Sequence, residues 1–281
     1  MQSLSFQSFD AMYQDAVRFV LEHWTHQMQA ELAAHCHAWG PGLFNFESYL
    51  HASSIRFYKA YCSFADEGSA QKICDVGGFW GVFPITLKTL GYDVTMTESL
   101  QYYGDSFNQL FEAVTQRGVR VVDFDPFEAE ASLPERFDVI TVMAVLEHYP
   151  HSLRGFMGNV SSLLREDGRL YLEVPNIAFW PKRVNLMRGL SPHAQLSDVF
   201  KSEVPFIGHH HEFTIGELRE LAQLSGLAVI SENFYNYSPG GLFGLRGLLR
   251  HPIQSLAFAL LKDSRECLAV LCKIREKEER A

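Results

Sequence analysis

The chain has 281 residues, 47% of them hydrophobic and 20% charged, which is typical of a globular protein that buries a full core without disulfides or metals. Its formal net charge of −9 argues against broad binding to nucleic-acid phosphates, so we expect no nucleic-acid partner. The five cysteines form no CxxC pair and no apolar run reaches roughly 18 residues, so we expect a cytoplasmic protein rather than a disulfide-rich secreted or membrane-spanning one.

The N-terminal part of the chain has helical spacing. Apolar residues recur at this spacing over residues 8–38, which predicts one helix that ends at the WGPG sequence of residues 39–42. A second helical piece is predicted over residues 46–64. We therefore divide the chain into an N-terminal helical region, residues 1–69, and a second domain, residues 70–281.

From residue 71 the pattern changes to strands that alternate with helices. Strands are predicted at KICDV, YDVTMTE, VRVVDFD, FDVITVMAV and RLYLEVP. Helices are predicted over residues 105–117 and 152–165, the latter followed by a turn at Asp167-Gly168. Such alternation predicts an α/β fold with a Rossmann-like, doubly wound, mostly parallel sheet, which binds ligands at the carboxyl ends of its strands.

The last third of the chain resumes this alternation after an interruption. Residues 176–213 are loop-rich and are predicted to be an insertion between strands five and six that covers the strand ends. A capping box at Thr214 and Glu217 predicts a helix over residues 214–225. Strands at 227–234 and 267–274 would complete a seven-stranded sheet, and REKEERA would be a solvated tail.

The apolar segment of residues 241–262 carries three basic residues, Arg246, Arg250 and Lys262. It is interpreted as a buried helix, a dimer face, or an interfacial helix that meets a lipid-linked acceptor. Pro252 interrupts it, which argues against one long amphipathic helix. Peripheral membrane contact and the oligomeric state stay open at this point.

The turn after the first strand, in KICDVGGFWG, indicates a ligand site. A dinucleotide loop needs GxGxxG, but Phe79 and Val82 stand at the third and sixth positions counted from Gly77. A P-loop would need a GK[ST] ending, which is absent. An acid followed by spaced glycines suits a bulky ligand that carries positive charge and no phosphate, as S-adenosylmethionine does.

Several motifs in order resemble the class I S-adenosylmethionine-dependent methyltransferases of small-molecule and glycan type. They are DVGGFWG, VTMTE, FDVITVMAVLEH and GRLYLEVPN, within residues 70–176, and the resemblance resumes at 209–234 and 267–274. It implies S-adenosylmethionine as cofactor, S-adenosylhomocysteine as product and a transferase activity. The cofactor-binding residues that it implies are Asp75, Gly77, Gly78, Phe79, Gly81, Glu98, Asp123, Phe124, Asp125, Met143 and Ala144.

Two of these residues carry specific expectations from the resemblance. Glu98 ends the second strand, and its two carboxylate oxygens can accept from both ribose hydroxyls. Of the two acids after the third strand, Asp125 is preferred to Asp123 for the adenine amino group. Either of these aspartates could instead cap the next turn.

Methyl transfer needs the acceptor held about 3–3.5 Å from the methyl group, and a hydroxyl acceptor also needs a base. His148 follows the fourth strand and is the first candidate base. The second set of candidates is His209, His210 and His211 with Glu212. The residues predicted to be catalytic are His148, His210 and His211. All three adjacent histidines cannot easily converge on one zinc ion.

No metal site is predicted. Glu147-His148 resembles part of the ExxEH metal site of ubiquinone-type O-methyltransferases, but Ala144 replaces its first glutamate. One carboxylate and one imidazole suit Mg²⁺ poorly, because this ion prefers several oxygen ligands. A further group is expected to be solvated or packed rather than metal-bound: His23, His26, His35, Cys36 and His37.

The predicted function is O-methylation of a small molecule or a sugar-containing intermediate, with that small-molecule or glycan acceptor as the partner. The aromatic pair Phe179-Trp180 would hold a ring-shaped acceptor or pack within the insertion. One alternative is methylation of nitrogen, carbon, protein or RNA. Another is a non-catalytic cofactor-binding protein, with Phe79 and Ala144 as marks of lost activity. A nicotinamide oxidoreductase fits least, because its glycine fingerprint is broken.

Overall fold

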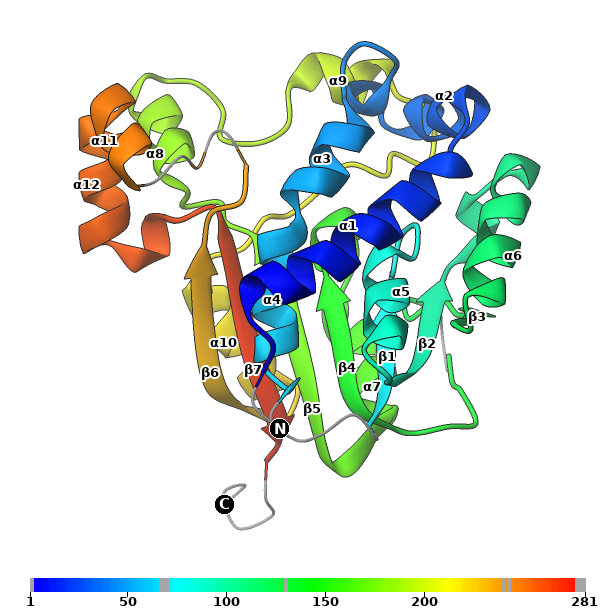
Figure 1. Cartoon of the computed structure of the whole chain (residues 1–281). Helices are drawn as coiled ribbons and strands as arrows, with labels where there is room; N and C mark the ends of the chain where they lie inside the picture. Colours follow the sequence, from blue (N-terminus) through cyan, green and yellow to red (C-terminus); the bar gives the residue numbers. More distant parts are fainter. Residues whose placement is uncertain (1–2, 66–70, 129–130, 239–240, 242–243, 276–281) are drawn as a thin grey trace.

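The computed structural model describes residues 3–65, 71–128, 131–238, 241 and 244–275. All but the first residue of the predicted REKEERA tail lie outside this range. The chain forms one seven-stranded sheet with helices on both faces (Figure 1). Its strands are β1 (Lys72–Val76), β2 (Asp93–Glu98), β3 (Arg120–Asp123), β4 (Phe137–Met143), β5 (Leu164–Pro175), β6 (Leu227–Tyr235) and β7 (Cys267–Ile274).

The strand order is β3-β2-β1-β4-β5-β7-β6. The neighbours among β1 to β5 pair in parallel, and β7 runs antiparallel between β5 and β6. The predicted seven-stranded, mostly parallel, doubly wound sheet is thus confirmed. The last strand is not at the edge of the sheet, because it inserts beside β5 and leaves β6 outermost.

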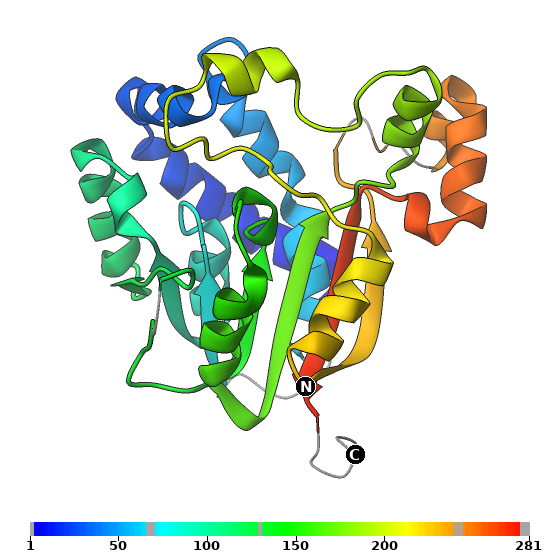
Figure 2. The ribbon, with the colours of Figure 1, turned by 180° about the vertical axis from the view of Figure 1, so that it is seen from behind.

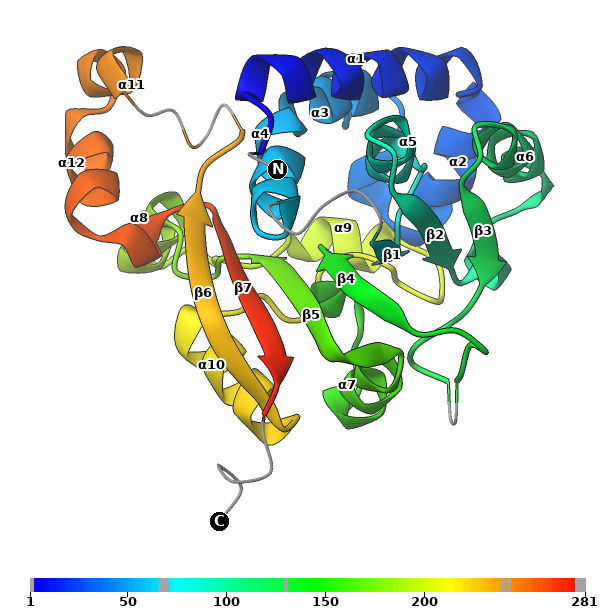
Figure 3. The ribbon, with the colours of Figure 1, turned by 60° about the horizontal axis from the view of Figure 1, so that its bottom comes forward.

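Two apolar layers hold the helices to the sheet (Figure 3). One layer joins the sheet to α1 (Phe6–Glu22), α3 (Phe46–Ala52), α4 (Ser54–Cys62), α5 (Val82–Thr89) and α6 (Asn108–Gln116). The other joins it to α7 (Leu153–Ser162) and α10 (Ile215–Leu224), which lie on the opposite face. The N-terminal helices share a core with the sheet. We therefore propose that the boundary at residue 70 separates two parts of the sequence and not two independent cores.

The predicted helix over residues 8–38 is wrong in its continuity. The chain forms α1 and then α2 (His26–His35), because the Thr25 side chain accepts from the Met28 N–H and starts a new helix. The predicted helix over residues 46–64 likewise divides, into α3 and α4, at Ser53. The helix predicted over residues 152–165 ends earlier, at Ser162. Asp167 and Gly168 lie within β5, where its register with β4 shifts between the pairs Phe137–Leu164 and Val139–Arg169.

The insertion between the fifth and sixth strands covers the carboxyl ends of the strands, as predicted (Figures 1 and 2). It contains α8 (Trp180–Met187) and α9 (Leu196–Lys201), and residues 202–213 then run back toward the sheet. Hydrogen bonds hold the insertion to the N-terminal helices. The Ile207 N–H donates to the His35 carbonyl at 3.0 Å, and the His37 N–H donates to Ser202 Oγ at 2.9 Å.

Residues 241–262 form no single long helix. The described part contains α11 (Gly244–Arg250) and α12 (Pro252–Leu260), and the break falls at Pro252. The α12 helix packs on the insertion through Phe258, whose ring stacks on Phe179 at 5.8 Å. Phe179 is therefore used in packing. Among the described residues, no helix is both long and apolar enough to cross a membrane.

Candidate functional site

A cavity of about 790 Å³ opens at the carboxyl ends of β1 and β4. From β1 the chain winds outward to β2 and β3, and from β4 it winds the other way, so this is the switch point where doubly wound sheets bind ligands. The cavity floor is made by the strand ends and the roof by N-terminal helices and the insertion. Aromatic side chains in its wall include Trp39, Phe44, Phe46, Tyr49, Phe57, Tyr102, Tyr149, Phe206 and Tyr237.

The glycine turn after β1 forms part of the floor, with Gly77, Gly78 and Phe79 on the wall. Gly77 has a φ of +67°, and a Cβ there would lie 2.6 Å from Cγ2 of Val145. The glycine is thus needed for packing against the turn after β4 as well as for any approach of a ligand. Phe79 has a φ of +55°, so it adopts the left-handed conformation that a glycine at this position would favour.

The acid at the end of β1 supports this turn from below. Asp75 is buried, and its Oδ1 accepts from the Thr141 hydroxyl at 2.5 Å. Gly81 is not among the described residues that line the cavity. It precedes α5 with a φ of +83°, and a Cβ there would lie 2.8 Å from Val114. The φ and the close contact of Gly81 explain a glycine here by the start of α5, and its predicted role in cofactor binding stays a prediction.

Glu98 lies at the end of β2 on the cavity wall and is buried. One of its carboxylate oxygens accepts the Phe79 N–H and the other accepts the Tyr103 hydroxyl at 2.9 Å. Burial raises the pKa of Glu98 to about 8, against the opposing effect of these two hydrogen bonds. These two donors fix the orientation of the Glu98 carboxyl group on the cavity wall.

The two acids after β3 are placed differently. Asp125 and Phe124 line the cavity, and Asp125 is held by the Ser99 hydroxyl at 2.8 Å and the Phe127 N–H at 2.9 Å. Asp123 is exposed, accepts the Leu100 N–H and is not among the described lining residues. The geometry thus favours Asp125 over Asp123, and Met143 and Ala144 also lie on the wall.

The buried acids Asp75 and Glu98 predict how stability depends on pH. Burial raises the pKa of Asp75 to about 7 and that of Glu98 to about 8. Between their ordinary values and these raised ones, the unfolded chain has lost protons that the folded chain keeps, so the free energy of unfolding falls as pH rises through this window. We expect urea midpoints of the free protein to fall less between pH 5 and pH 8 when both acids are changed, in the Asp75→Asn/Glu98→Gln variant. An unchanged pH slope would contradict this.

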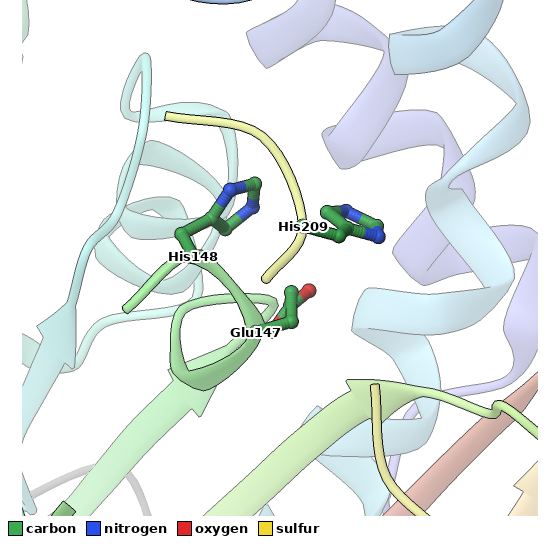
Figure 4. A group of neighbouring side chains, drawn as sticks. All are labelled: Glu147, His148 and His209. Atoms are coloured by element: carbon green, nitrogen blue, oxygen red, sulfur yellow. The ribbon is translucent and has the colours of Figure 1, made fainter. Parts of the chain in front are cut away.

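A polar cluster of Glu147, His148 and His209 lines one side of the cavity (Figure 4). Glu147 and His148 come from the turn after β4, and His209 comes from the insertion. One possible ligand atom from each residue lies within 4.8 Å of the others. The rings of the two histidines meet edge to face, with centroids 4.9 Å apart.

Backbone hydrogen bonds fix this meeting of two distant segments. The His148 Nδ1–H donates to the Ile207 carbonyl at 2.7 Å, and the His210 N–H donates to the Glu147 carbonyl at 2.6 Å. His209 Nδ1 lies 2.9 Å from Oε1 of Glu212, which also forms an ion pair with Lys182. Both imidazoles of the cluster are therefore oriented by a hydrogen bond at Nδ1.

The cluster has an unusual protonation pattern. Burial and the neighbouring His209 lower the pKa of His148 to about 3, and burial raises the pKa of Glu147 to about 7. Burial alone would lower the pKa of His209, but the hydrogen bond to Glu212 and the nearby carboxylates raise it overall. His148 is thus a neutral imidazole and a weak base on its own.

The three predicted catalytic histidines are not brought together. His148 lines the cavity, but His210 and His211 line a second, smaller hollow with residues such as His151 and Phe213. His211 pairs with Glu217 at 3.2 Å, and His210 bonds to the Phe206 carbonyl at 3.0 Å. The neighbour that reaches the cavity is His209. A catalytic role for His210 or His211 stays a prediction without support from this arrangement.

A buried ion pair on the cavity wall was not predicted from the sequence. Arg56 of α4 donates from Nη2 and Nε to Oε2 of Glu173, at 2.5 and 2.9 Å, and both residues are almost fully buried. Tyr49 accepts from Arg56 at 2.9 Å. The acid in the apolar strand RLYLEVP was the available signal, since a buried carboxylate needs a partner.

A family model described as a methyltransferase domain matches residues 24–232. No curated protein sequence matches the chain. Solved structures with the same fold include magnesium protoporphyrin IX methyltransferase from Synechocystis PCC 6803 with S-adenosylhomocysteine bound (14% identity, 85% of this chain and 92% of that chain, TM-score 0.53). Coclaurine N-methyltransferase is similar (14%, 96% and 89%, 0.51), as is the N-methyltransferase NodS from Bradyrhizobium japonicum WM9 (13%, 80% and 88%, 0.50). At these identities the likeness shows the fold.

Proposed function

The chain belongs to the methyltransferase family, and from this premise we propose that it transfers a methyl group from S-adenosylmethionine to an oxygen atom of a small molecule. The product of the cofactor would be S-adenosylhomocysteine, which is bound in the structures of magnesium protoporphyrin IX methyltransferase and coclaurine N-methyltransferase.

One observation carries the proposal. A single cavity contains acids suited to a nucleoside at the strand ends, the polar cluster of Glu147, His148 and His209, and several aromatic side chains. Glu98 and Asp125 stand at the ends of neighbouring strands, where ribose hydroxyls and an adenine amino group would find acceptors. Small-ligand pockets measure about 300–1,000 Å³, so a cavity of about 790 Å³ has room for a cofactor and a modest acceptor.

The chemistry asked of the protein is mainly positioning. The methyl carbon of a sulfonium is already activated, so the acceptor must be held in line with the sulfur–carbon bond and shielded from water. A hydroxyl acceptor must also lose its proton as the new bond forms. Glu147, His148 and His209 are the polar groups placed to receive that hydroxyl, which is why oxygen is the proposed acceptor atom.

The aromatic wall favours a ring-bearing acceptor. Trp39, Phe46 and Phe206 offer flat apolar surfaces, and no described lysine lines the cavity. Phenols and other aromatic alcohols therefore fit the wall better than a free sugar, and a sugar-containing intermediate would need an aromatic or apolar portion.

The test has two steps on the full chain. S-Adenosylhomocysteine should bind with micromolar affinity in calorimetric titration, while NADH should not bind. The protein should then transfer the label of methyl-labelled S-adenosylmethionine to a panel of phenols, aryl amines and aryl glycosides, with mass spectrometry locating the methyl group. Methylation of phenolic oxygen supports the proposal, methylation of nitrogen alone overturns the acceptor atom, and absence of S-adenosylhomocysteine binding by folded protein overturns the cofactor.

A further inference from the structure

Glu147 is in an unfavourable state for a side chain with no ligand. It is fully buried, and neither of its carboxylate oxygens has a hydrogen-bond partner among the described residues. Buried carboxylates are normally paired or hydrogen-bonded, because desolvation of the charge costs several kcal/mol or more. Glu147 lines the same cavity as His148 and His209, and possible ligand atoms of the three residues lie close together. The missing partner is therefore expected to be a cation.

His148 presents a lone pair to a metal ion, and His209 can do so once its Nε2 carries no proton. A carbonyl oxygen can only accept, so the Nδ1 of His148 that faces the Ile207 carbonyl carries the proton, and the neutral ring has its lone pair on Nε2. Glu212 accepts in the same way from Nδ1 of His209. Metal-binding histidines characteristically donate their other ring N–H to a carbonyl or carboxylate, which fixes the tautomer.

The ligand atoms are close enough to converge. Each lies within 4.8 Å of the others, and donor atoms around one ion with bonds of about 2.1 Å stand roughly 3–3.5 Å apart. Side-chain rotations that move these atoms by about an ångström would bring them to the separations of metal ligands. The backbone is already fixed, because the His148–Ile207 and His210–Glu147 hydrogen bonds hold the turn after β4 against the insertion.

We propose that Glu147, His148 and His209 bind one divalent first-row transition ion, such as Fe²⁺, Co²⁺ or Zn²⁺, on the acceptor side of the cavity. Two imidazoles and one carboxylate favour such ions over Mg²⁺, which prefers oxygen ligands. Ala144 removes a second carboxylate from this turn, and His209 supplies a nitrogen ligand from the insertion in its place. The sequence alone offered only Glu147 and His148, so it gave no reason to expect a third ligand.

Three protein ligands leave open coordination positions toward the cavity. A hydroxyl oxygen bound there would lose its proton more readily, because a divalent ion lowers the pKa of a bound oxygen. This role rests on the proposed methyl transfer, whereas the binding of the ion does not. The ion would also pair the Glu147 carboxylate, and Glu212 with Lys182 behind it would keep His209 oriented.

The test is direct metal binding by the full chain, freed of any histidine tag and treated with a chelator. Titration with Co²⁺ should show one tight site per chain, with visible d–d bands and no thiolate charge-transfer band, and Zn²⁺ but not Mg²⁺ should displace the Co²⁺. Glu147→Gln and His209→Ala should each weaken Co²⁺ binding by at least about 100-fold, and Glu212→Gln by about 10- to 100-fold.

His211→Ala is the matched control, because His211 lies in the same histidine run but pairs with Glu217 outside the cluster. It should bind Co²⁺ as the unchanged chain does. Binding that survives Glu147→Gln and His209→Ala, or no Co²⁺ site in folded protein, would overturn the site. S-Adenosylhomocysteine titration on the same samples separates the two proposals, since cofactor binding without Co²⁺ binding refutes only the metal site, and the reverse refutes only the cofactor.

Discussion

Replacement of Glu98 by glutamine should weaken S-adenosylhomocysteine binding by at least about 100-fold. Two ribose hydroxyls would favour the ionised form of Glu98 against its raised pKa, and each hydrogen bond to a charged acceptor contributes about 1.5–3 kcal/mol. The glutamine amide has one accepting oxygen, and its NH₂ group would face donors. The Phe79 N–H and the Tyr103 hydroxyl compete for the same oxygen, so little acceptor capacity remains for a ligand. Calorimetric titration of the purified variant measures the change.

Asp123→Asn is the matched control for Glu98. Asp123 pairs with Glu98 in register on the neighbouring strand, but it is exposed and outside the cavity. Its substitution should change the affinity for S-adenosylhomocysteine by no more than about threefold, the range of a small surface effect. Wild-type affinity in a folded Glu98→Gln variant would remove Glu98 from the ribose site, and a large loss in Asp123→Asn would move the adenine contact there.

Replacement of Arg56 by methionine should destabilise the fold by about 3–5 kcal/mol. The change leaves the Glu173 carboxylate buried without its cation, and the second oxygen of Glu173 already has no hydrogen-bond partner. Urea unfolding followed by circular dichroism gives the free energy. Since a typical domain is stable by only about 5–15 kcal/mol, a large drop in soluble yield is expected as well.

The double variant Arg56→Met/Glu173→Leu separates charge from packing. With both charges removed, stability should recover most of the loss, because an apolar pair of similar volume often matches a buried ion pair. A double variant as unstable as Arg56→Met alone would show that the loss came from packing around α4 rather than from the unpaired carboxylate. A single variant as stable as the unchanged chain would also contradict the prediction.

The sequence predicted the sheet well because the strands are short, apolar and bounded by turn residues. The predicted KICDV and CLAVLCKI strands coincide with β1 and β7. The helix prediction over residues 8–38 failed because the apolar periodicity continues across Thr25, whereas the helical backbone is interrupted there. A capping side chain ends one helix and starts another without changing the apolar pattern.

The floor of the site was more predictable than its roof. Floor residues such as Glu98 follow from their place at strand ends, where parallel strands bring them to one edge. No such rule predicts the positions of His209, His210 and His211. These residues lie in an irregular segment, and His209 is placed by hydrogen bonds between residues distant in the chain, His148 with Ile207 and His210 with Glu147, and by its own bond to Glu212. The Arg56–Glu173 pair joins residues 117 positions apart, which no local pattern reveals.

The hydrogen bonds between the insertion and the N-terminal helices have a consequence for the order of folding. The contact between His37 and Ser202 closes a loop of 165 positions, whereas β1 pairs with β2 and β4 over much shorter separations. Long loops cost more entropy to close, so β1, β2 and β4 should pair first and the roof of the cavity should form last. During synthesis, the cofactor half would thus leave the ribosome before the segment that carries His209. A nascent chain arrested before residue 200 should therefore lack the complete cluster, even if β1 to β5 are already paired.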